Sequence, residues 1–332
     1  MTLRFAILGS GAWGTTVAML LAQQPDHDVR LWSARADNAE QLQRQRENVD
    51  LLPGIRLAET ILLTADIREA VEQVDLLVVA VPTVYLRTSL ASVTSQLPRG
   101  IPIMSLVKGI ERQTFLRPTQ ILEELTGTRP MAVLSGPSHA EEVSRGLPAS
   151  VVLASQDKSL AEWIQPRLNT ERFRVYTNAD LVGVELAGAL KNVIAIAAGI
   201  SEGLELGDNA KAALITRGLV EMTRFGKAHG ALRETFAGLA GMGDLITTCM
   251  SGHGRNRRVG LRLAQGDSLQ EILESTKMVA EGVYTTQGVH GKAQQLKVPM
   301  PITQAVYQIL YEDKPPRQAV DELMMRTLKS EL

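Results

Sequence analysis

Residues 3–24 read LRFAILGSGAWGTTVAMLLAQQ: an apolar run, a glycine loop and a helical pattern in immediate succession. The loop has G-x-G-x-x-G spacing between a strand and a helix, which is the arrangement that binds dinucleotides. Its glycines allow a tight turn, a close backbone approach to a pyrophosphate and close packing of helix on strand, while helix N–H groups bind the phosphates. We expect cofactor contacts from the whole loop: Gly9, Ser10, Gly11, Ala12, Trp13 and Gly14.

Strand and helix patterns alternate from this loop to about residue 177, and then the strands stop. The run 75–82, DLLVVAVP, is apolar almost throughout, as in parallel strands buried on both faces. Other predicted strands are 3–8, 28–32, 61–64, 102–107, 131–134, 149–154 and 173–176. Later segments have only helical patterns: 181–204, 209–229, 259–265, 268–274, 284–296, 302–311 and 315–327. We predict an α/β Rossmann-type doubly wound sheet over 1–179, followed by an all-helical domain over 180–332.

The composition excludes several classes of protein. The 332 residues carry 35 basic against 36 acidic side chains, a net charge of −1, which argues against nucleic acid or an acidic membrane as the main partner. A single cysteine, Cys249, allows no disulfide within the chain and fits a reducing compartment. The apolar run near the N-terminus is too short for a signal peptide. The stretch 181–204 is long enough to cross a membrane, but charged residues interrupt it. We expect a cytoplasmic protein with no stable membrane insertion and no metal site, and we leave a homodimer open.

The end of the second predicted strand bears on the choice of cofactor. An NAD-selective site usually has an acidic residue there, which binds the ribose 2′-hydroxyl. This chain reads Leu31-Trp-Ser-Ala-Arg35, without an acid, and Arg35 could meet a 2′-phosphate. The alternative is an ordinary solvated arginine. The sequence therefore favours NADP(H), or tolerance of NADP(H) and NAD(H).

Polar residues follow two later strands, at the edge where ligands bind in such sheets. Lys108 comes directly after the strand 102–107 and could meet an anion, although a plain loop lysine is the alternative. After 131–134 the chain reads Ser135-Gly-Pro-Ser-His-Ala-Glu141, in which Ser138 and Glu141 have capping-box spacing. A helix cap would explain Ser138 without any function. His139 is a weaker candidate for an acid–base group.

Lys191 interrupts the most apolar stretch of the chain. At helical period it shares a face with small or apolar residues, namely Val184, Ala187, Gly188, Ile194, Ala195 and Ala198. An unpaired buried ammonium is costly, so either the head of the lysine escapes to water or it serves in a water-poor catalytic or anion site. We favour the second interpretation, because the rest of the chain supplies suitable neighbours.

Two further segments offer these neighbours. Glycines in 238–244, GLAGMGD, are expected to break helical order, bring the backbone close to something and present Asp244. In 254–258, GRNRR, a glycine precedes a helix start with Arg255 and Asn256, a combination suited to an anion. A solvated basic cluster is the alternative. A dinucleotide fold with a buried lysine, an aspartate and an anion clamp predicts an NAD(P)-dependent dehydrogenase of a small anionic alcohol.

Six motifs in order carry a resemblance over nearly the whole chain, to about residue 297: GSGAWG from Gly9, VKGIE from Val107, LSGPSHAEEV from Leu134, ELAGALKNV from Glu185, GLAGMGDL from Gly238 and GRN from Gly254. With them the chain resembles bacterial NAD(P)-dependent sn-glycerol-3-phosphate dehydrogenases. The resemblance implies interconversion of dihydroxyacetone phosphate and sn-glycerol 3-phosphate for glycerophospholipid biosynthesis. It also implies a C-terminal domain like that of 6-phosphogluconate dehydrogenases.

The resemblance assigns roles residue by residue. Lys191 would be the proton donor and acceptor. Substrate contacts would come from Lys108, Gly136, Ser138, Lys191, Asp244, Gly254, Arg255 and Asn256. Cofactor contacts beyond the glycine loop would come from Arg35, Lys108, Ala140, Arg255, Val279 and Glu281.

The chain departs from the family pattern at three positions. Gly254 and Ala12 stand where the family often has serine, and Ala34 where it often has histidine or arginine. Two other functions compete: a nicotinamide-binding sensor that has lost catalysis, and a related β-hydroxyacid dehydrogenase. Retention of Lys191, Asp244 and the Arg255–Asn256 pair argues against the sensor, and the GMGD and GRN blocks favour the triose phosphate.

Overall fold

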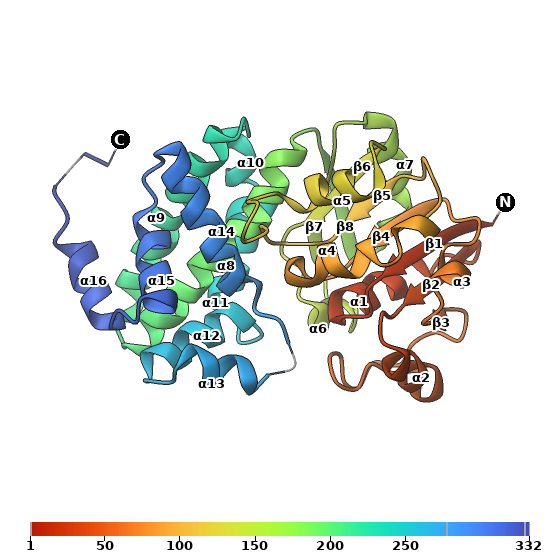
Figure 1. Ribbon diagram of the computed structural model, residues 1–332, viewed down its shortest axis with the longest axis horizontal. Helices are drawn as coiled ribbons and strands as arrows, with labels where there is room; N and C mark the ends of the chain where they lie inside the picture. The colour runs from red at the N-terminus through yellow and green to blue at the C-terminus, as the bar shows by residue number, and fades with distance from the viewer. Residues whose placement is uncertain (1, 277, 329, 332) are drawn as a thin grey trace.

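The computed structural model describes residues 2–276, 278–328 and 330–331, so the end residues Met1 and Leu332 of the predicted domains lie outside the described residues. It divides into a sheet-containing half and a helical half (Figure 1). One eight-stranded sheet has the order β3-β2-β1-β4-β5-β6-β7-β8. The strands are β1 (Leu3–Leu8), β2 (His27–Trp32), β3 (Leu62–Thr64), β4 (Leu76–Val79), β5 (Ile103–Ser105), β6 (Met131–Ser135), β7 (Ala149–Ser155) and β8 (Phe173–Asn178).

The sheet is parallel except for the pairing of β6 with β7. Two apolar layers enclose it. Side chains of α1 (Ala12–Leu21), α2 (Ala36–Gln45), α6 (Ala140–Val143) and α7 (Lys158–Leu168) belong to one layer, and those of α3 (Ile67–Val71), α4 (Thr83–Ala91) and α5 (Pro118–Thr126) belong to the other. A short 3₁₀ turn, η1 (Thr94–Gln96), follows α4. Because both faces are covered, the central strands are apolar without alternation, as predicted.

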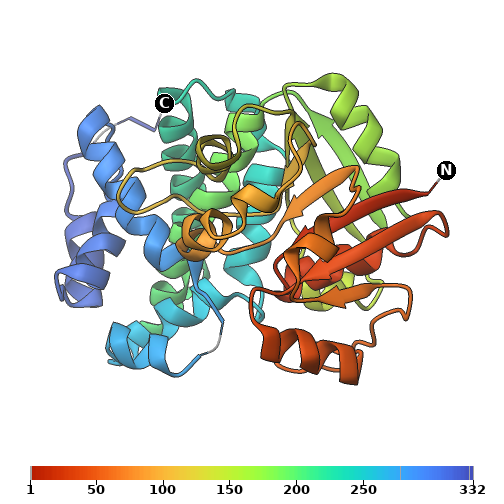
Figure 2. The same cartoon turned by 45° about the vertical axis from the view of Figure 1, so that its right-hand side comes forward.

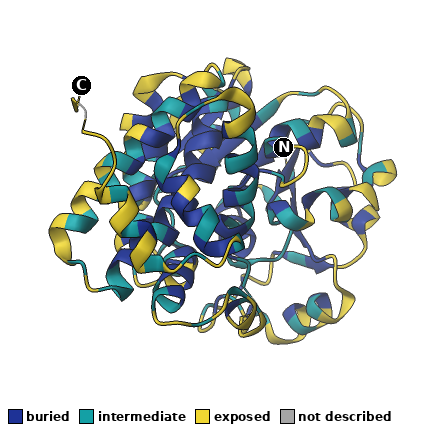
Figure 3. Ribbon diagram, turned by 60° about the vertical axis from the view of Figure 1, so that its left-hand side comes forward, coloured by how far each residue is buried: buried dark blue, intermediate teal, exposed yellow. Residues whose placement is uncertain are grey.

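The helical half is built around α8 (Leu181–Gly203), which is buried along nearly its whole length. The surrounding elements are α9 (Gly207–Ala228), α10 (Arg233–Ala237), the π-helical turn η2 (Leu239–Gly243), α11 (Asp244–Met250), α12 (Arg255–Ala264), α13 (Leu269–Glu274), α14 (Glu281–Leu296), α15 (Pro301–Tyr311) and α16 (Pro316–Met324). Figure 2 shows the same division from a second side, and in Figure 3 the exposed residues lie mainly on peripheral elements.

Helix α8 alone, among the described residues, is long and apolar enough to cross a membrane. Within the fold, however, 89% of its most apolar window is buried by other parts of the chain. Helices that form the core of a globular protein have this same composition. The length and hydropathy of α8 are therefore explained by its central position in the helical half.

The predicted fold class is confirmed, since every strand among the described residues lies before residue 179. One local prediction is wrong and another holds only in part. Ser138 does not cap α6, because the helix begins one residue later with His139 as its N-cap, and the Ser138 hydroxyl donates to the Gly136 carbonyl instead. Gly238 is extended and separates α10 from η2, so helical order breaks there as predicted, whereas Gly241 and Gly243 lie within η2 and do not end it. Element η2 runs directly into α11, and the backbone at Gly241 lies against Phe236.

Candidate active site

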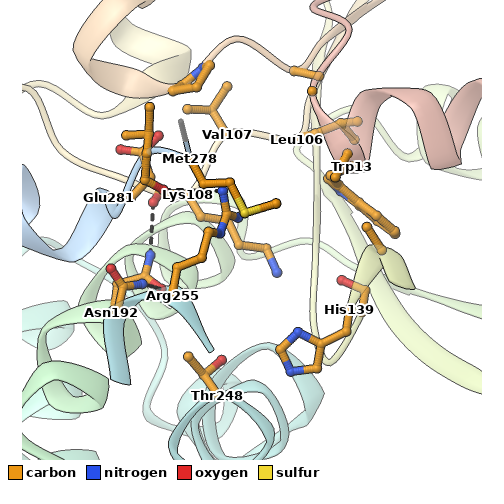
Figure 4. Close-up of a pocket in the computed structure, with 18 of the residues that line it drawn as sticks. Trp13, Leu106, Val107, Lys108, His139, Asn192, Thr248, Arg255, Met278 and Glu281 are labelled. Carbon is orange, nitrogen blue, oxygen red and sulfur yellow. Dashed lines mark hydrogen bonds between the residues drawn. The ribbon is translucent and has the colours of Figure 1, made fainter. Parts of the chain in front are cut away.

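A pocket lies between the two halves and takes its lining from both (Figure 4). The sheet half supplies the glycine loop, the carboxyl ends of β4 and β5, and the segment after β6. The helical half supplies α8, α11, the start of α12 and the segment before α14. Trp13 and His139 lie on one side of the pocket in Figure 4, and Asn192 and Glu281 lie on the opposite side. The pocket is therefore placed where the two halves meet at the strand ends.

The glycine loop has the shape that a dinucleotide needs. Gly9 has a φ of +117°, which favours glycine, and a Cβ on Gly14 would lie 2.1 Å from the Gly9 carbonyl oxygen. A Cβ on Gly11 would meet open space, so a ligand could approach the backbone there. Helix α1 starts at Ala12 and points its N-terminus at the pocket, where its N–H groups can bind an anion. The loop therefore fits a dinucleotide pyrophosphate on its own geometry.

Two lysines bind one carboxylate beside the pocket. The Lys191 Nζ donates to Asp244 Oδ1 at 2.6 Å and to the Thr248 hydroxyl at 2.6 Å. The Lys108 Nζ donates to Asp244 Oδ2 at 2.8 Å and to the Gly136 carbonyl at 3.0 Å. Lys108 comes from the sheet half, whereas Lys191 and Asp244 come from the helical half. The cluster thus joins the halves and carries one net positive charge when both lysines are protonated.

At both Lys191 and Asp244, burial and the charge of the ionic partner act on the pKa in opposite directions. Desolvation lowers the pKa of Lys191 to about 8, although the Asp244 carboxylate partly offsets this effect and Lys108 adds to it. Burial alone would raise the pKa of Asp244, but the neighbouring Lys108 and Lys191 outweigh it and lower that pKa. Asp244 therefore stays ionised, while Lys191 can exchange a proton near neutral pH.

An amide chain connects three elements below the pocket. The Asn192 side chain donates to the Lys108 carbonyl at 3.1 Å and accepts from Asn256 at 2.9 Å. Asn256 in turn accepts from the Gly282 N–H at 2.9 Å. These bonds use the Asn256 oxygen and one of the two hydrogens on its Nδ2, so the other amide hydrogen and the backbone N–H at the start of α12 can each meet a ligand.

Arg255 and Glu281 line the pocket near this chain. The exposed Arg255 guanidinium donates to the Val279 carbonyl at 3.2 Å. Glu281 accepts from the Thr83 N–H at 2.7 Å through one oxygen, and its other buried oxygen has no partner among the described residues. Burial raises the pKa of Glu281 to about 7. An unpaired buried oxygen at a pocket wall can receive a ligand donor.

Most of the predicted site residues line this one pocket, and the others differ in how they relate to it. Gly136 and Asp244 support Lys108 through hydrogen bonds, and Gly9 and Ser10 lie in the same loop as Gly11. Arg35 does not line the pocket: it is exposed at the start of α2 and pairs with Asp37. The lining residues that were predicted are Gly11, Ala12, Trp13, Gly14, Lys108, Ser138, Ala140, Lys191, Gly254, Arg255, Asn256, Val279 and Glu281.

Asn192 and Thr248 line the pocket, although no role was predicted for them. A signal for each was present in the sequence. Thr248 lies four residues after Asp244, hence on the same helix face, and Asn192 follows Lys191 in an otherwise apolar helix. His139 also lines the pocket, with its ring centre 5.9 Å from that of His253, and desolvation lowers its pKa.

Comparison with known proteins agrees with this geometry. Two family models match: the NAD-dependent glycerol-3-phosphate dehydrogenase N-terminus over residues 4–161 and the C-terminus over residues 180–321. A glycerol-3-phosphate dehydrogenase [NAD(P)+] of Geobacter sulfurreducens is 49% identical, over 100% of this chain and 99% of that protein. One from Geobacillus thermodenitrificans is 50% identical, over 98% of this chain and 96% of that protein.

A solved structure extends the comparison to the fold. The crystal structure of glycerol-3-phosphate dehydrogenase from Coxiella burnetii has a TM-score of 0.94 and 41% sequence identity. The match covers 98% of this chain and 99% of that chain. The likeness of fold therefore includes both halves of the chain.

Proposed function

The chain belongs to the NAD-dependent glycerol-3-phosphate dehydrogenase family, and from that premise we propose that it reduces dihydroxyacetone phosphate to sn-glycerol 3-phosphate reversibly with NAD(P)H. The observation that carries this proposal is the Lys191 ammonium, held by Asp244 and Thr248 where both halves line one pocket. We further propose 1–179 as the cofactor domain and 180–332 as the domain that carries the proton chemistry.

Lys191 acts as the acid in the reducing direction. A nicotinamide cofactor held by the glycine loop would supply a hydride to the substrate carbonyl carbon, and negative charge would develop on the carbonyl oxygen. Lys191 donates its proton to that oxygen, while Asp244 and Thr248 hold the ammonium in place. This interaction is strongest in the transition state and therefore raises kcat. In the oxidising direction the neutral amine of Lys191 accepts the proton.

The start of α12 holds the substrate phosphate. Arg255 offers a planar guanidinium, and the N–H groups of the first helical turn, including that of Asn256, favour an anion. Lys108 adds a second cation, which the Gly136 carbonyl helps to hold, and Ser138 and Gly254 belong to the remaining wall. The family often has serine at position 254. Glycine has no side chain, so any contact of this chain with the substrate at that position comes from the Gly254 backbone.

The cofactor lies along the glycine loop of residues 9–14. Ala140, Val279 and Glu281 line the same pocket and would hold another part of the cofactor, for which the Glu281 oxygen without a hydrogen-bond partner offers an acceptor. Arg35 meets the 2′-phosphate after releasing Asp37, so NADPH serves at least as well as NADH. A comparison of kcat/KM for the two cofactors tests this role: Arg35→Ala should lower NADPH use relative to NADH, and an unchanged ratio would contradict it.

The phosphate clamp provides the main test of substrate class. NADPH absorbance should fall when dihydroxyacetone phosphate is added to the enzyme. Arg255→Ala should raise KM for dihydroxyacetone phosphate far more than for phosphate-free dihydroxyacetone, because the lost contact involves only the phosphate. Equal effects on both substrates would make Arg255 a structural residue. A substrate panel that includes 6-phosphogluconate and hydroxyisobutyrate distinguishes the related dehydrogenases.

The cellular setting is also part of the proposal. The single cysteine and the balanced charge support a cytoplasmic location. Membership of the family, rather than composition, is the ground for proposing that the enzyme feeds glycerophospholipid synthesis. Its partners are small molecules, and a homodimer is the assembly we propose. Light scattering of the purified enzyme at micromolar concentration tests this assembly, and a monomeric mass would contradict it.

A further inference from the structure

The structure contains two buried glutamates that cap helices in the same way, and one of them lies in the interface between the halves. Glu185 of α8 and Glu221 of α9 are each only 2% exposed. Each accepts hydrogen bonds at the start of a helix that begins with proline, α5 for Glu185 and α15 for Glu221. Glu221 joins two helices of the helical half, whereas Glu185 reaches from the helical half to the sheet half.

The contacts of Glu185 are numerous for one carboxylate. Its Oε1 accepts from the Thr119 N–H at 2.8 Å, and its Oε2 accepts from the Thr119 hydroxyl at 2.8 Å and from Arg117 Nη1 at 2.5 Å. Glu185 and Arg117 form an ion pair in which the side chains are 1% and 16% exposed. A buried ion pair whose other donors and acceptors are hydrogen-bonded holds its two side chains in one geometry. Removal of one partner leaves the charge of the other buried and uncompensated.

These contacts hold one end of the segment that carries Lys108. Residues 108–117 leave the sheet half after β5 and insert into the helical half, where Ile110 belongs to the apolar cluster around α8. Helix α8 binds the segment at both ends: Asn192 binds the carbonyl of Lys108 at the first end, and Glu185 binds Arg117 at the second. Lys191, which shares Asp244 with Lys108, lies on the same helix between these two anchors.

We propose that Glu185 is a positioning residue that acts through Lys108, by fixing the 108–117 segment onto the helix that carries Lys191. This inference rests on the proposed function. The proposed role of Glu185 is to set the distance between the Lys108 and Lys191 side chains. These lysines come from different halves of the molecule, so contacts between residues that are close in the sequence would not fix that distance. A shift of the segment would move the Lys108 Nζ away from Asp244 and from the pocket that it lines.

The test is a double-mutant cycle with a matched control. Glu185→Gln keeps the shape of the side chain and one oxygen that accepts from the Thr119 N–H. Its NH₂ group replaces the carboxylate oxygen that accepted from Arg117 and from the Thr119 hydroxyl, so Arg117 loses its charged partner. We expect it to lower kcat/KM for dihydroxyacetone phosphate about tenfold, the scale of a small misplacement, mainly through KM. In a Lys108→Met background the same change should lower kcat/KM less than about twofold, because Lys108 is already absent.

Glu221→Gln is the control for the loss of a buried helix cap. Glu221 accepts from the Ile302 N–H, the Thr303 N–H and the Thr303 hydroxyl, at 2.9, 2.8 and 2.7 Å, so it matches Glu185 in its backbone and threonine donors. It should lower the unfolding temperature and leave kcat/KM unchanged in both backgrounds. If Glu185→Gln does not fold, Arg117→Met carries the same cycle, since it removes the donor to Glu185 from the opposite side.

Two results would overturn the role of Glu185: equal losses with and without Lys108, or no loss in either background. A cofactor dissociation constant that rises in parallel with KM would also overturn it, because general loosening of the interface would then be the cause. An unmodified enzyme that does not oxidise NADPH with dihydroxyacetone phosphate would instead overturn the proposed function. The two failures are therefore distinguishable.

Discussion

Lys191 and Lys108 approach the same carboxylate from opposite halves of the molecule, yet their surroundings differ. Lys191 projects from the middle of the core helix α8, and its side chain is 8% exposed. Lys108 lies on a segment after β5, and its side chain is 17% exposed. Lys191 donates to Asp244 Oδ1 and to a threonine hydroxyl, whereas Lys108 donates to Asp244 Oδ2 and to a backbone carbonyl.

This difference separates two tasks that one positive charge could perform. A buried ammonium with a lowered pKa is suited to donating a proton, because its charged form is already destabilised by desolvation. A more accessible lysine beside the pocket is suited to attracting an anionic substrate. Asp244 accepts hydrogen bonds from both lysines, and its negative charge offsets the repulsion between them, so the two cations can lie close together. We therefore propose that Lys191 transfers the proton and that Lys108 binds the anion.

The largest effect is expected from removal of Lys191. Lys191→Met keeps an apolar stem of similar length, so α8 should pack normally and Asp244 retains Lys108 as a partner. We expect kcat to fall about 10²- to 10⁴-fold, the usual scale for a positioned proton transfer. Steady-state kinetics of NADPH oxidation measure the loss, and cofactor affinity should change little because the glycine loop lies in the other half.

Lys191→Ala separates catalysis from packing. It should be as inactive as Lys191→Met but less stable, since truncation leaves a cavity on a buried helix face. Retention of most of kcat in Lys191→Met would reverse the comparison. Lys108 would then be the acid, and Lys191 a structural lysine.

The sequence predicts the architecture around these lysines well, for reasons that are local. Apolar runs at strand period, helical patterns and the glycine loop each depend on neighbouring residues only, so β1, α1 and α8 could be placed without tertiary information. Helices α4 and α5 were not predicted. The first, TVYLRTSLA, has a mixed sequence with no clear apolar stripe.

The site was harder to predict because its contacts join residues that are distant in the chain. That Asp244 lies beside Lys191 was a hypothesis from chemistry, and the sharing of Asp244 with Lys108 was not predicted, since these residues are 136 positions apart. Likewise, the pairing of the Asn256 side chain with Asn192 and Gly282 was not predicted. Long-range pairing of polar groups leaves no periodic signal in a sequence.

The next largest effect is expected from Lys108→Met, which tests the anion-binding side of the comparison. Loss of one charged contact should lower kcat/KM for dihydroxyacetone phosphate about 10- to 100-fold, mainly by raising KM. The matched substrate is phosphate-free dihydroxyacetone, whose KM should change less because the lost attraction acts on the phosphate charge. If kcat falls as far as it does in Lys191→Met, the two lysines share one task and the separation is wrong.

The pH profile of the unmodified enzyme tests the assignment of the proton donor. The ammonium of Lys191 predominates below its pKa of about 8 and is lost above it. The kcat/KM for reduction should therefore be level on the acidic side of pH 8 and fall about tenfold per pH unit on the alkaline side. In the oxidising direction, which needs the neutral amine, kcat/KM should rise with pH and level off above 8. A reduction profile that stays flat to pH 10 would contradict the assignment.

The smallest effect is a shift of that profile when Lys108 is removed. Lys108 lowers the pKa of Lys191, because a like charge nearby disfavours the protonated form of Lys191. In Lys108→Met the alkaline fall in kcat/KM for reduction should therefore move to higher pH, although the maximal value is lower. Arg35→Ala is the control, since Arg35 is exposed and pairs with Asp37 away from the pocket, and its profile should keep the original position. A shift to lower pH in Lys108→Met would mean that Lys108 supports the charge of Lys191 rather than opposing it, and the electrostatic difference between the two lysines would have to be drawn the other way.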